Sequence, residues 1–237
     1  MGTNTQTTTT GTERKVSQLM GDGHFRLGRY GAAIGHYRAS GDIERVIACG
    51  NECLSRGQLA DGITAYEAVG RIIPPELLIA CGDMIVRGPS YAHHSDQAVA
   101  AYALAGASDR LIALGEKLLD LGTMKGHWKL AVPAYIASGV AKRIRVIAQA
   151  CLSQGFIGHA LDAFAAIGDK KGLVATGALA QKEGETDLAI KAFEAAGSWQ
   201  SLIDLGDNRL KAGYDERAQV AYEAAARIYA QQLPAKS

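Results

Sequence analysis

The chain has 237 residues, with 25 Lys and Arg side chains against 24 Asp and Glu, so its formal net charge is only +1 at pH 7. This balance excludes the strong positive field that draws a protein to nucleic acid or to an anionic membrane. Hydrophobic residues make up 48% of the chain and aromatic residues only 6%, so we expect a core of small aliphatic side chains. No apolar stretch is long enough to span a membrane.

The first thirteen residues are rich in threonine and lack the apolar segment of a signal peptide. We expect residues 1–13 to form a disordered tail, residues 14–232 a single folded domain, and residues 233–237 a second short tail. Because no targeting signal is recognised, the predicted location is the cytoplasm.

Glycine is unusually frequent, with 28 residues in the chain, about 12% against roughly 7% in average proteins. The glycines recur at intervals of 29 to 34 residues, which is typical of a helical-repeat protein. They fall into three columns when the repeats are aligned. The first column contains Gly28, Gly57, Gly88, Gly122, Gly155, Gly184 and Gly213, the second Gly41, Gly70, Gly106, Gly139, Gly168 and Gly197, and the third Gly21, Gly50, Gly115, Gly177 and Gly206.

The columns predict where helices end. Apolar residues at helical spacing precede the first column, as in Leu111, Leu114 and Leu118, and the glycine then closes that helix in a left-handed cap. A second helix follows and ends at the second column. It carries a small residue and, four positions later, an aromatic, such as Ala33 and Tyr37. We expect the small residue to let helices approach closely and the aromatic to fill the gap between neighbouring repeats.

In chain order, the pattern predicts about seven hairpins of paired helices. Asp42 and Asp169 directly follow second-column glycines, where they are well placed to cap the next helix. The last predicted helix covers residues 215–232 and is longer than the others, because Ala226 replaces the closing glycine. The expected fold is therefore all-α.

Four cysteines, Cys49, Cys53, Cys81 and Cys151, form no CxxC pair and have no histidine at the spacing of a zinc site. Cys53 and Cys151 occupy equivalent repeat positions, which favours packing over ligation. We expect all four to be small core residues.

The segment LGDNRLKAGYDERAQVAYEAA at 205–225 resembles a tetratricopeptide repeat, with the spacing of Gly206, Gly213, Ala218 and Tyr222 typical of that family. Segments 21–40 and 177–196 repeat these offsets. The resemblance implies a right-handed α/α superhelix whose concave surface, lined by the first helices, binds a peptide or partner protein. The chain departs from the family in its regular period of 29 residues instead of 34 and in lacking the usual proline.

The resemblance implies a set of groove-facing residues on the first helices, which the alternative of a tighter superhelix would instead place partly in the core. This set is Ile47, Asn51, Ile112, Glu116, Arg145 and Gln149. Basic residues near the starts of first helices are candidates for binding an acidic peptide or a phosphate, or are solvated helix-start residues. These are Arg110, Lys142, Arg143 and Lys171.

Two insertions interrupt the repeat, at residues 89–96 and 124–129. Both fall between the first and second helix of adjacent repeats, so we expect them to lie side by side on one edge. They carry residues suited to protein contacts, or they are loops without a binding role. The candidates are Tyr91, His93, His94, His127 and Trp128.

The sequence contains no P-loop, GxSxG or HExxH motif. We therefore expect no enzymatic activity, no catalytic residue, no cofactor and no metal site. The predicted function is a protein–protein interaction scaffold or adaptor. An RNA- or anion-binding repeat protein that uses the basic residues is the alternative, although nucleic acid is not the expected partner, and polymerisation through the ends of the stack is a third hypothesis.

Overall fold

The structure, a computed structural model, describes residues 11–121 and 125–233, with the side chains of residues 125 and 126 left aside. These residues form fourteen α-helices, which confirms the prediction of an all-α chain of about seven hairpins. The helices are α1 (Gly11–Arg26), α2 (Tyr30–Ser40), α3 (Ile43–Ser55), α4 (Leu59–Ala68), α5 (Pro75–Arg87), α6 (Ser95–Leu104), α7 (Ser108–Leu119), α8 (Lys125–Ala137), α9 (Ala141–Ser153), α10 (Ile157–Ala166), α11 (Lys170–Lys182), α12 (Thr186–Ala196), α13 (Trp199–Lys211) and α14 (Asp215–Gln232). The predicted N-terminal tail lies outside the described residues, apart from residues 11–13, which begin α1. The predicted C-terminal tail also lies outside them beyond Leu233.

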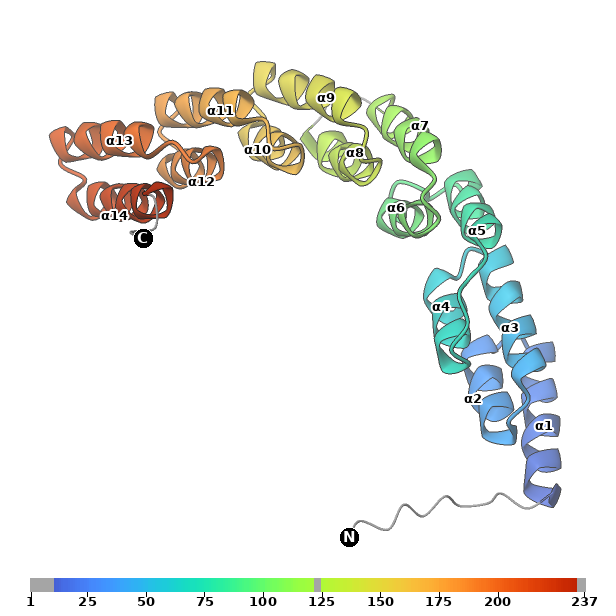
Figure 1. The fold of residues 1–237 in the computed structure, drawn as a ribbon. Helices are drawn as coiled ribbons and strands as arrows, with labels where there is room; N and C mark the ends of the chain where they lie inside the picture. Colours follow the sequence, from blue (N-terminus) through green and yellow to red (C-terminus); the bar gives the residue numbers. More distant parts are fainter. Residues whose placement is uncertain (1–10, 122–124, 234–237) are drawn as a thin grey trace, which may run out of the picture. The chain divides into compact units, whose positions relative to one another are not determined.

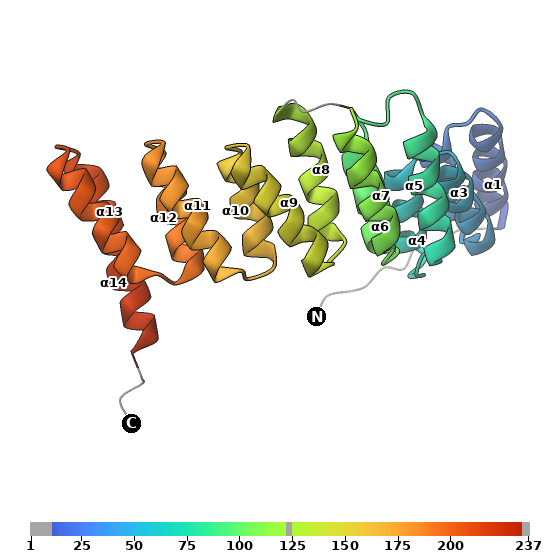
Figure 2. The ribbon, with the colours of Figure 1, turned by 90° about the horizontal axis from the view of Figure 1, so that it is seen from above.

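The chain divides into two compact units between Arg110 and Leu111. Unit 1 contains α1–α6 and the start of α7, and unit 2 contains the rest of α7 and α8–α14. Within each unit the odd-numbered helices form one layer and the even-numbered helices another (Figure 1). Seen from above, the helices of each unit lie side by side, and α14 extends beyond the end of α13 (Figure 2).

Local capping sets the helix ends. The Asp42 carboxylate accepts a hydrogen bond from the Arg45 backbone N–H at 3.2 Å, and Asp169 accepts from the Gly172 N–H at 3.1 Å, so both predicted caps are confirmed. The residues with positive φ in the described chain are all glycines of the first two columns. They are Gly28, Gly41, Gly57, Gly70, Gly106, Gly139, Gly155, Gly168, Gly184, Gly197 and Gly213.

The prediction for Gly88 is wrong, because α5 ends there in an extended conformation with φ −64° and ψ 150°. Pro89 follows, and the residue before a proline is driven towards extended backbone. Gly122, the other irregular member of this column, lies outside the described residues.

The aromatic rings of the second helices pack against glycines of the first helices, mostly those of the third column. A Cβ built on Gly21 would lie 2.5 Å from Cε1 of Tyr37, so no side chain fits without displacing the ring. The same contact recurs at Gly115 with Tyr135, Gly177 with Phe193 and Gly206 with Tyr222, and at Gly82 with Tyr102, although Gly82 was not among the predicted column. It is looser at Gly50, where a Cβ would lie 2.9 Å from the Ala65 side chain and 3.1 Å from the Tyr66 ring. The aromatics thus pack between the two helices of their own hairpin. They also contact the next hairpin, as the prediction had it, since Tyr37 belongs to one core cluster with Val46 and Cys49 of α3.

Hairpin five, formed by α9 and α10, departs from this arrangement. Ala148 stands where the glycine would be, sixteen residues before Phe164. The Phe164 ring lies instead against Gly172 of the following helix, α11, where a Cβ would overlap the ring. A glycine in the next hairpin therefore supplies space that the hairpin's own helix does not.

All four cysteines are buried and free, as expected for core residues. Burial raises the pKa of the Cys49 thiol to about 11, with a smaller contribution from Glu52, and burial alone raises that of Cys151 to about 12. Both thiols are therefore neutral at pH 7 and pack as small apolar groups.

The two insertions differ in structure. The second helices begin seven residues before their column aromatic, as Ser95 precedes Tyr102 in α6, so the first insertion falls in the turn before that helix. By contrast, α8 begins at Lys125, ten residues before Tyr135. The expectation of a second inserted loop is corrected accordingly, since residues 125–129 belong to the first turns of α8, and Met124 lies outside the described residues.

Gly21→Ala is expected to lower the free energy of unfolding by about 1–3 kcal/mol, because the Tyr37 ring leaves no room for a methyl group. Gly35 lies in the same hairpin, in the interior of α2, with no atom within 4 Å of a built Cβ. Gly35→Ala is the matched control and should stabilise by about 0.5–1 kcal/mol through helix propensity. Urea unfolding followed by circular dichroism measures both changes, and equal stability of the two variants would contradict the packing argument.

Candidate interaction surfaces

Four tyrosines donate their hydroxyl groups to the residue that follows the glycine against which their ring packs. The O···O distances are 2.7 Å for Tyr37 to Asp22, 2.6 Å for Tyr66 to Asn51, 2.8 Å for Tyr102 to Asp83 and 2.6 Å for Tyr222 to Asp207. Burial and the hydrogen bond to Asp22 together raise the pKa of the Tyr37 hydroxyl. The hydroxyl therefore stays protonated and serves as a donor.

An arginine from the next hairpin faces several of these acids. Arg45 Nη1 lies 2.7 Å from the Asp22 carboxylate, and its guanidinium also lies over the Tyr37 ring. We call such a tyrosine, its acid and the arginine of the following hairpin a seam group. A second seam group has Arg110 at 3.4 Å from Asp83. Arg143 lies 3.9 Å from Glu116, which follows the glycine against which the Tyr135 ring packs.

Whether an arginine faces the junction depends on the charge of the residue that follows the glycine. Asn51 is neutral, and Leu77 of α5 stands at the arginine position of that seam. Hairpins five and six have Phe164 and Phe193 as their aromatics, and neither ring has a hydroxyl to donate. An arginine is thus found opposite an acid and an aliphatic residue opposite an amide.

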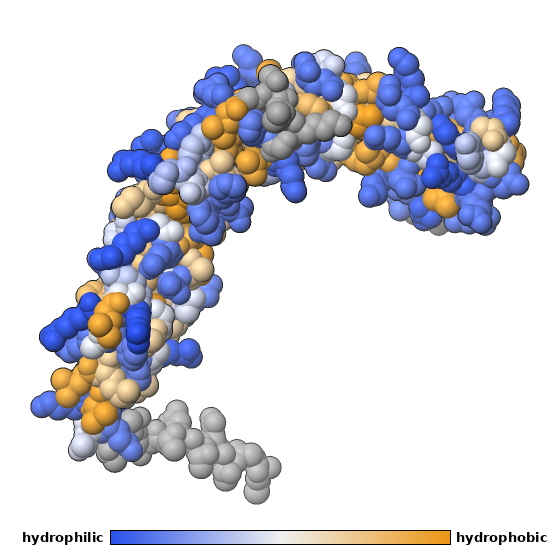
Figure 3. Space-filling view, turned by 180° about the vertical axis from the view of Figure 1, so that it is seen from behind, coloured by the Kyte–Doolittle hydropathy of each residue, from blue (hydrophilic) through white to orange (hydrophobic). Residues whose placement is uncertain are grey.

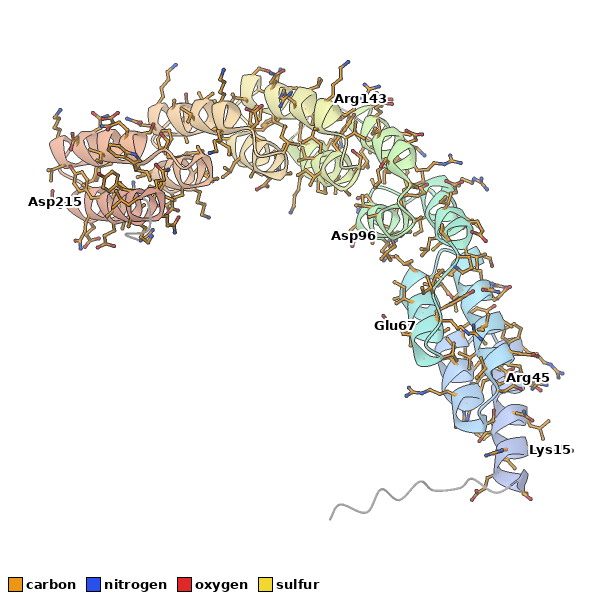
Figure 4. The ribbon with its side chains drawn as sticks, viewed as in Figure 1. Lys15, Arg45, Glu67, Asp96, Arg143 and Asp215 are labelled. Carbon is orange, nitrogen blue, oxygen red and sulfur yellow. The ribbon has the colours of Figure 1, made fainter. Side chains whose placement is uncertain are left out.

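Several predicted binding residues belong to these seams. Arg110 and Arg143 face carboxylates, and Asn51 accepts a tyrosine hydroxyl. Arg145 donates to Asp169 at 2.8 Å. Arg45 and Arg143 both lie on the odd-numbered layer of their own units (Figure 4). The predicted anion-binding arginines are therefore already close to carboxylates of the chain itself.

The remaining predicted groove residues also lie on odd-numbered helices. Ile47 of α3 is half-buried and packs against the core cluster that contains Tyr66 and Leu78. Ile112 is half-buried, and Gln149 is exposed. Lys142 and Lys171 are exposed and form no ion pair within the described residues.

Two adjoining hollows lie at the first insertion, in unit 1. A hollow of about 310 Å³ is lined by Arg56, Gly57, Met84, Ile85, Gly88, Pro89, Ser90, Tyr91, His94 and Gln97. A second, of about 410 Å³, is lined by Gln58, Leu59, Ala60, Asp61, Ile63, Asp96, Gln97 and Ala100. They share Gln97, and we call the two together the insertion edge.

The insertion edge includes only part of the predicted loop set. Tyr91 and His94 line it, and His93 is exposed beside it. His127 and Trp128 belong to α8 in unit 2, where the Trp128 ring lies 5.4 Å from that of Phe156. Trp128 is therefore a packing residue of its own unit.

Aliphatic side chains are also exposed on α1. Val16, Leu19 and Met20 have exposed fractions of 51%, 64% and 49%. Hydrophobic residues gather over this end of unit 1 in the space-filling view (Figure 3).

Sequence reasoning missed the acids Asp22 and Asp83 of the seam groups and also Asp207, which accepts the hydroxyl of Tyr222. The signal was present, because an acid or an amide directly follows the column glycine in every repeat whose aromatic is tyrosine. In the repeats with Phe164 and Phe193, the corresponding residues are Gln149 and Ala178.

Over residues 11–121 and 125–233, no helix is long and apolar enough to cross a membrane. The same residues contain no cluster of three His, Cys, Asp or Glu side chains able to hold a metal ion. No family model matches the chain, and no curated protein is similar to it.

Asp22→Asn tests the first seam group, since asparagine still accepts the Tyr37 hydroxyl, as Asn51 accepts that of Tyr66. The Tyr37 hydrogen bond and Arg45 lower the pKa of the Asp22 carboxyl. The ionised Asp22 carboxylate therefore stabilises the fold at neutral pH, and this stabilisation is lost as the pH falls through the lowered pKa. The variant should be less stable by about 0.5–1 kcal/mol at pH 7, and the difference should vanish at an acid pH below the lowered pKa of Asp22.

Urea unfolding at both pH values measures this difference. A destabilisation of the same size at pH 7 and at the acid end would show that the Asp22 charge is not its source.

Proposed function

We propose that this chain is a non-catalytic interaction module that binds a segment of a partner protein at the insertion edge. The observation that carries the proposal is the pair of adjoining hollows at the point where the repeat is interrupted. Insertions in repeat proteins commonly mark a binding face. Here the insertion forms part of the wall of one hollow, through Pro89, Ser90 and Tyr91.

The chemistry of the insertion edge suits a short peptide with mixed side chains. Aliphatic side chains such as Met84, Ile85 and Ile63 line the hollows and offer sites for apolar anchors. Gln97, shared by both hollows, can donate and accept hydrogen bonds, and Asp61 and Asp96 can accept them. At about 310 and 410 Å³, each hollow has room for one or two side chains.

Arg56 at the rim is held in place by its neighbours. Its Nε lies 2.7 Å from the Glu52 carboxylate, and its guanidinium lies 5.3 Å from the centre of the Tyr30 ring. Arginine held in this way presents its remaining N–H donors at a low cost in side-chain entropy.

The resemblance to tetratricopeptide repeats supports the same class of function, because proteins of that family typically bind peptides or partner proteins. We infer that the odd-numbered layer, including Ile47, Ile112 and Gln149, supplies further contacts. Anion binding has less support, since Arg110 and Arg143 face Asp83 and Glu116. We retain the cytoplasm as the proposed location.

Replacing His94 and Gln97 together by alanine should reduce partner capture by about tenfold or more, as expected for residues at the centre of an interface. Both side chains are exposed, and His94 makes no side-chain cap to α6, so the melting temperature should not change. Capture from the native cells on the immobilised chain, quantified by mass spectrometry, is the measurement.

The matched control replaces His93 and Gln154, which are exposed and line neither hollow. Equal capture by the two double variants would refute the insertion edge as the binding site. Capture that falls in parallel for all proteins between low and moderate salt would instead favour phosphate-dominated binding.

A further inference from the structure

The last hairpin of unit 2 has an apolar hollow of about 490 Å³ between α13 and α14. It is lined by Trp199, Ile203, Tyr222, Ala225, Ala226 and Tyr229. The Trp199 and Tyr229 rings meet edge to face, with centres 5.2 Å apart. The hollow is therefore bounded by rigid aromatic side chains and a floor of alanines.

The repeat shows what occupies the equivalent place in another hairpin. Ile47 and Ile203 both stand three residues before a column glycine, and Tyr66 corresponds to Tyr222. In hairpin two, Ile47 and Tyr66 pack with Leu77 and Leu78 of the next first helix, α5. In the last hairpin, no helix of the described chain takes that place.

The same end carries an acid that lacks its arginine. Asp207 accepts the Tyr222 hydroxyl at 2.6 Å, as the acids of the seam groups do. No arginine or lysine of the described chain forms an ion pair with it. Trp199, Ile203 and Asp207 are spaced i, i+4 and i+8, so the apolar hollow and the free carboxylate lie along one face of α13.

The surface formed by the first turns of α14, beside the hollow, is polar. Asp215 and Gln219 occupy the positions at which hairpin one has the buried Tyr30 and Ile34. Covering this surface with a complete hairpin, including one from a second copy of the chain, would bury polar groups at a cost in free energy. The exposed surface therefore fits a single short helix better than another repeat.

We propose that the end of unit 2 formed by α13 and α14 binds a short amphipathic helix of a partner protein. An arginine of that helix pairs with Asp207, and an adjacent aliphatic side chain enters the hollow. The occupant follows from charge complementarity, because Arg45, Arg110 and Arg143 face the corresponding acids and are each followed directly by a buried aliphatic residue. This surface is separate from the insertion edge, which belongs to unit 1.

The probe is a labelled peptide with the sequence of residues 108–119, SDRLIALGEKLL, which contains the seam arginine Arg110 and its neighbour Leu111. Its binding to the full-length chain is measured by fluorescence anisotropy. A dissociation constant on the order of 10–100 µM is expected, because an isolated helix of this length is mostly unfolded in water.

Two variants of the full-length chain test the contacts separately. Asp207→Asn keeps an acceptor for Tyr222, as in the pair of Tyr66 with Asn51, but removes the charge. It should weaken binding about three- to fivefold, the effect of an exposed ion pair. The Arg110→Gln substitution in the peptide should weaken binding by the same factor, and combining it with Asp207→Asn should weaken binding no further.

Ala226→Gln places a larger side chain in the hollow from an exposed helical position and should weaken binding more than about tenfold. Asp162→Asn is the control for charge, because Asp162 is exposed on α10 and belongs neither to α13 nor to the lining of the hollow. Circular dichroism melting of each variant should match that of the unmodified chain.

No binding up to 1 mM peptide would overturn the proposal, as would binding that neither Asp207→Asn nor Ala226→Gln changes. Sedimentation of the chain alone provides the last check. Self-association that Ala226→Gln abolishes would identify a second copy as the occupant and would also overturn the proposal.

Discussion

The seating of an aromatic ring on a glycine sets the geometry of most of the hairpins. At Gly21, Gly82 and Gly206 the ring occupies the space that a Cβ would need, so the two helices approach more closely there than any side chain would allow. The same contact places the hydroxyls of Tyr37, Tyr102 and Tyr222 beside the residue that follows the glycine. The seam groups therefore depend on this packing, because it brings the hydroxyl within reach of the carboxylate.

The seam groups link one hairpin to the next. Asp22 and Asp83 each have two partners, the tyrosine of their own hairpin and an arginine of the following one, as Asp22 has with Tyr37 and Arg45. The arginine side chains are about half exposed, so each pair stabilises by about 1 kcal/mol at most. Their larger effect is on specificity, since a helix that brings a second acid to such a seam would be repelled.

Much of the fold could be predicted from the sequence because its signals are local. A glycine that must adopt positive φ marks a helix end whatever surrounds it, and the second-column glycines all do so. The prediction of a left-handed cap at Gly88 was wrong because Pro89 forces extended backbone on it. The prediction of a second inserted loop was wrong because its residues extend α8 by a turn. Arg110 and Arg143 were predicted as binding residues from their positions near the starts of first helices, but the acids that they face lie in the preceding hairpin, 27 residues away. Alignment of glycines and apolar residues gives no indication of such a pair. The hollows of the insertion edge are formed by residues of two stretches, 56–63 and 84–100, that meet only in three dimensions.

The packing of Phe164 makes hairpin five depend on the first helix of hairpin six. A repeat protein is commonly regarded as a row of interchangeable modules, gained or lost by duplication and deletion. Here Ala148 takes the position of the usual glycine, and Gly172 of the next hairpin provides the space for the ring, so hairpin five depends on the hairpin that follows it. In front of any other hairpin, Phe164 would meet a side chain at the position of Gly172, namely Arg45, Leu77, Arg110, Arg143 or Ser201. The regular glycine pattern thus contains one junction at which exchange of the following hairpin would force the ring to move.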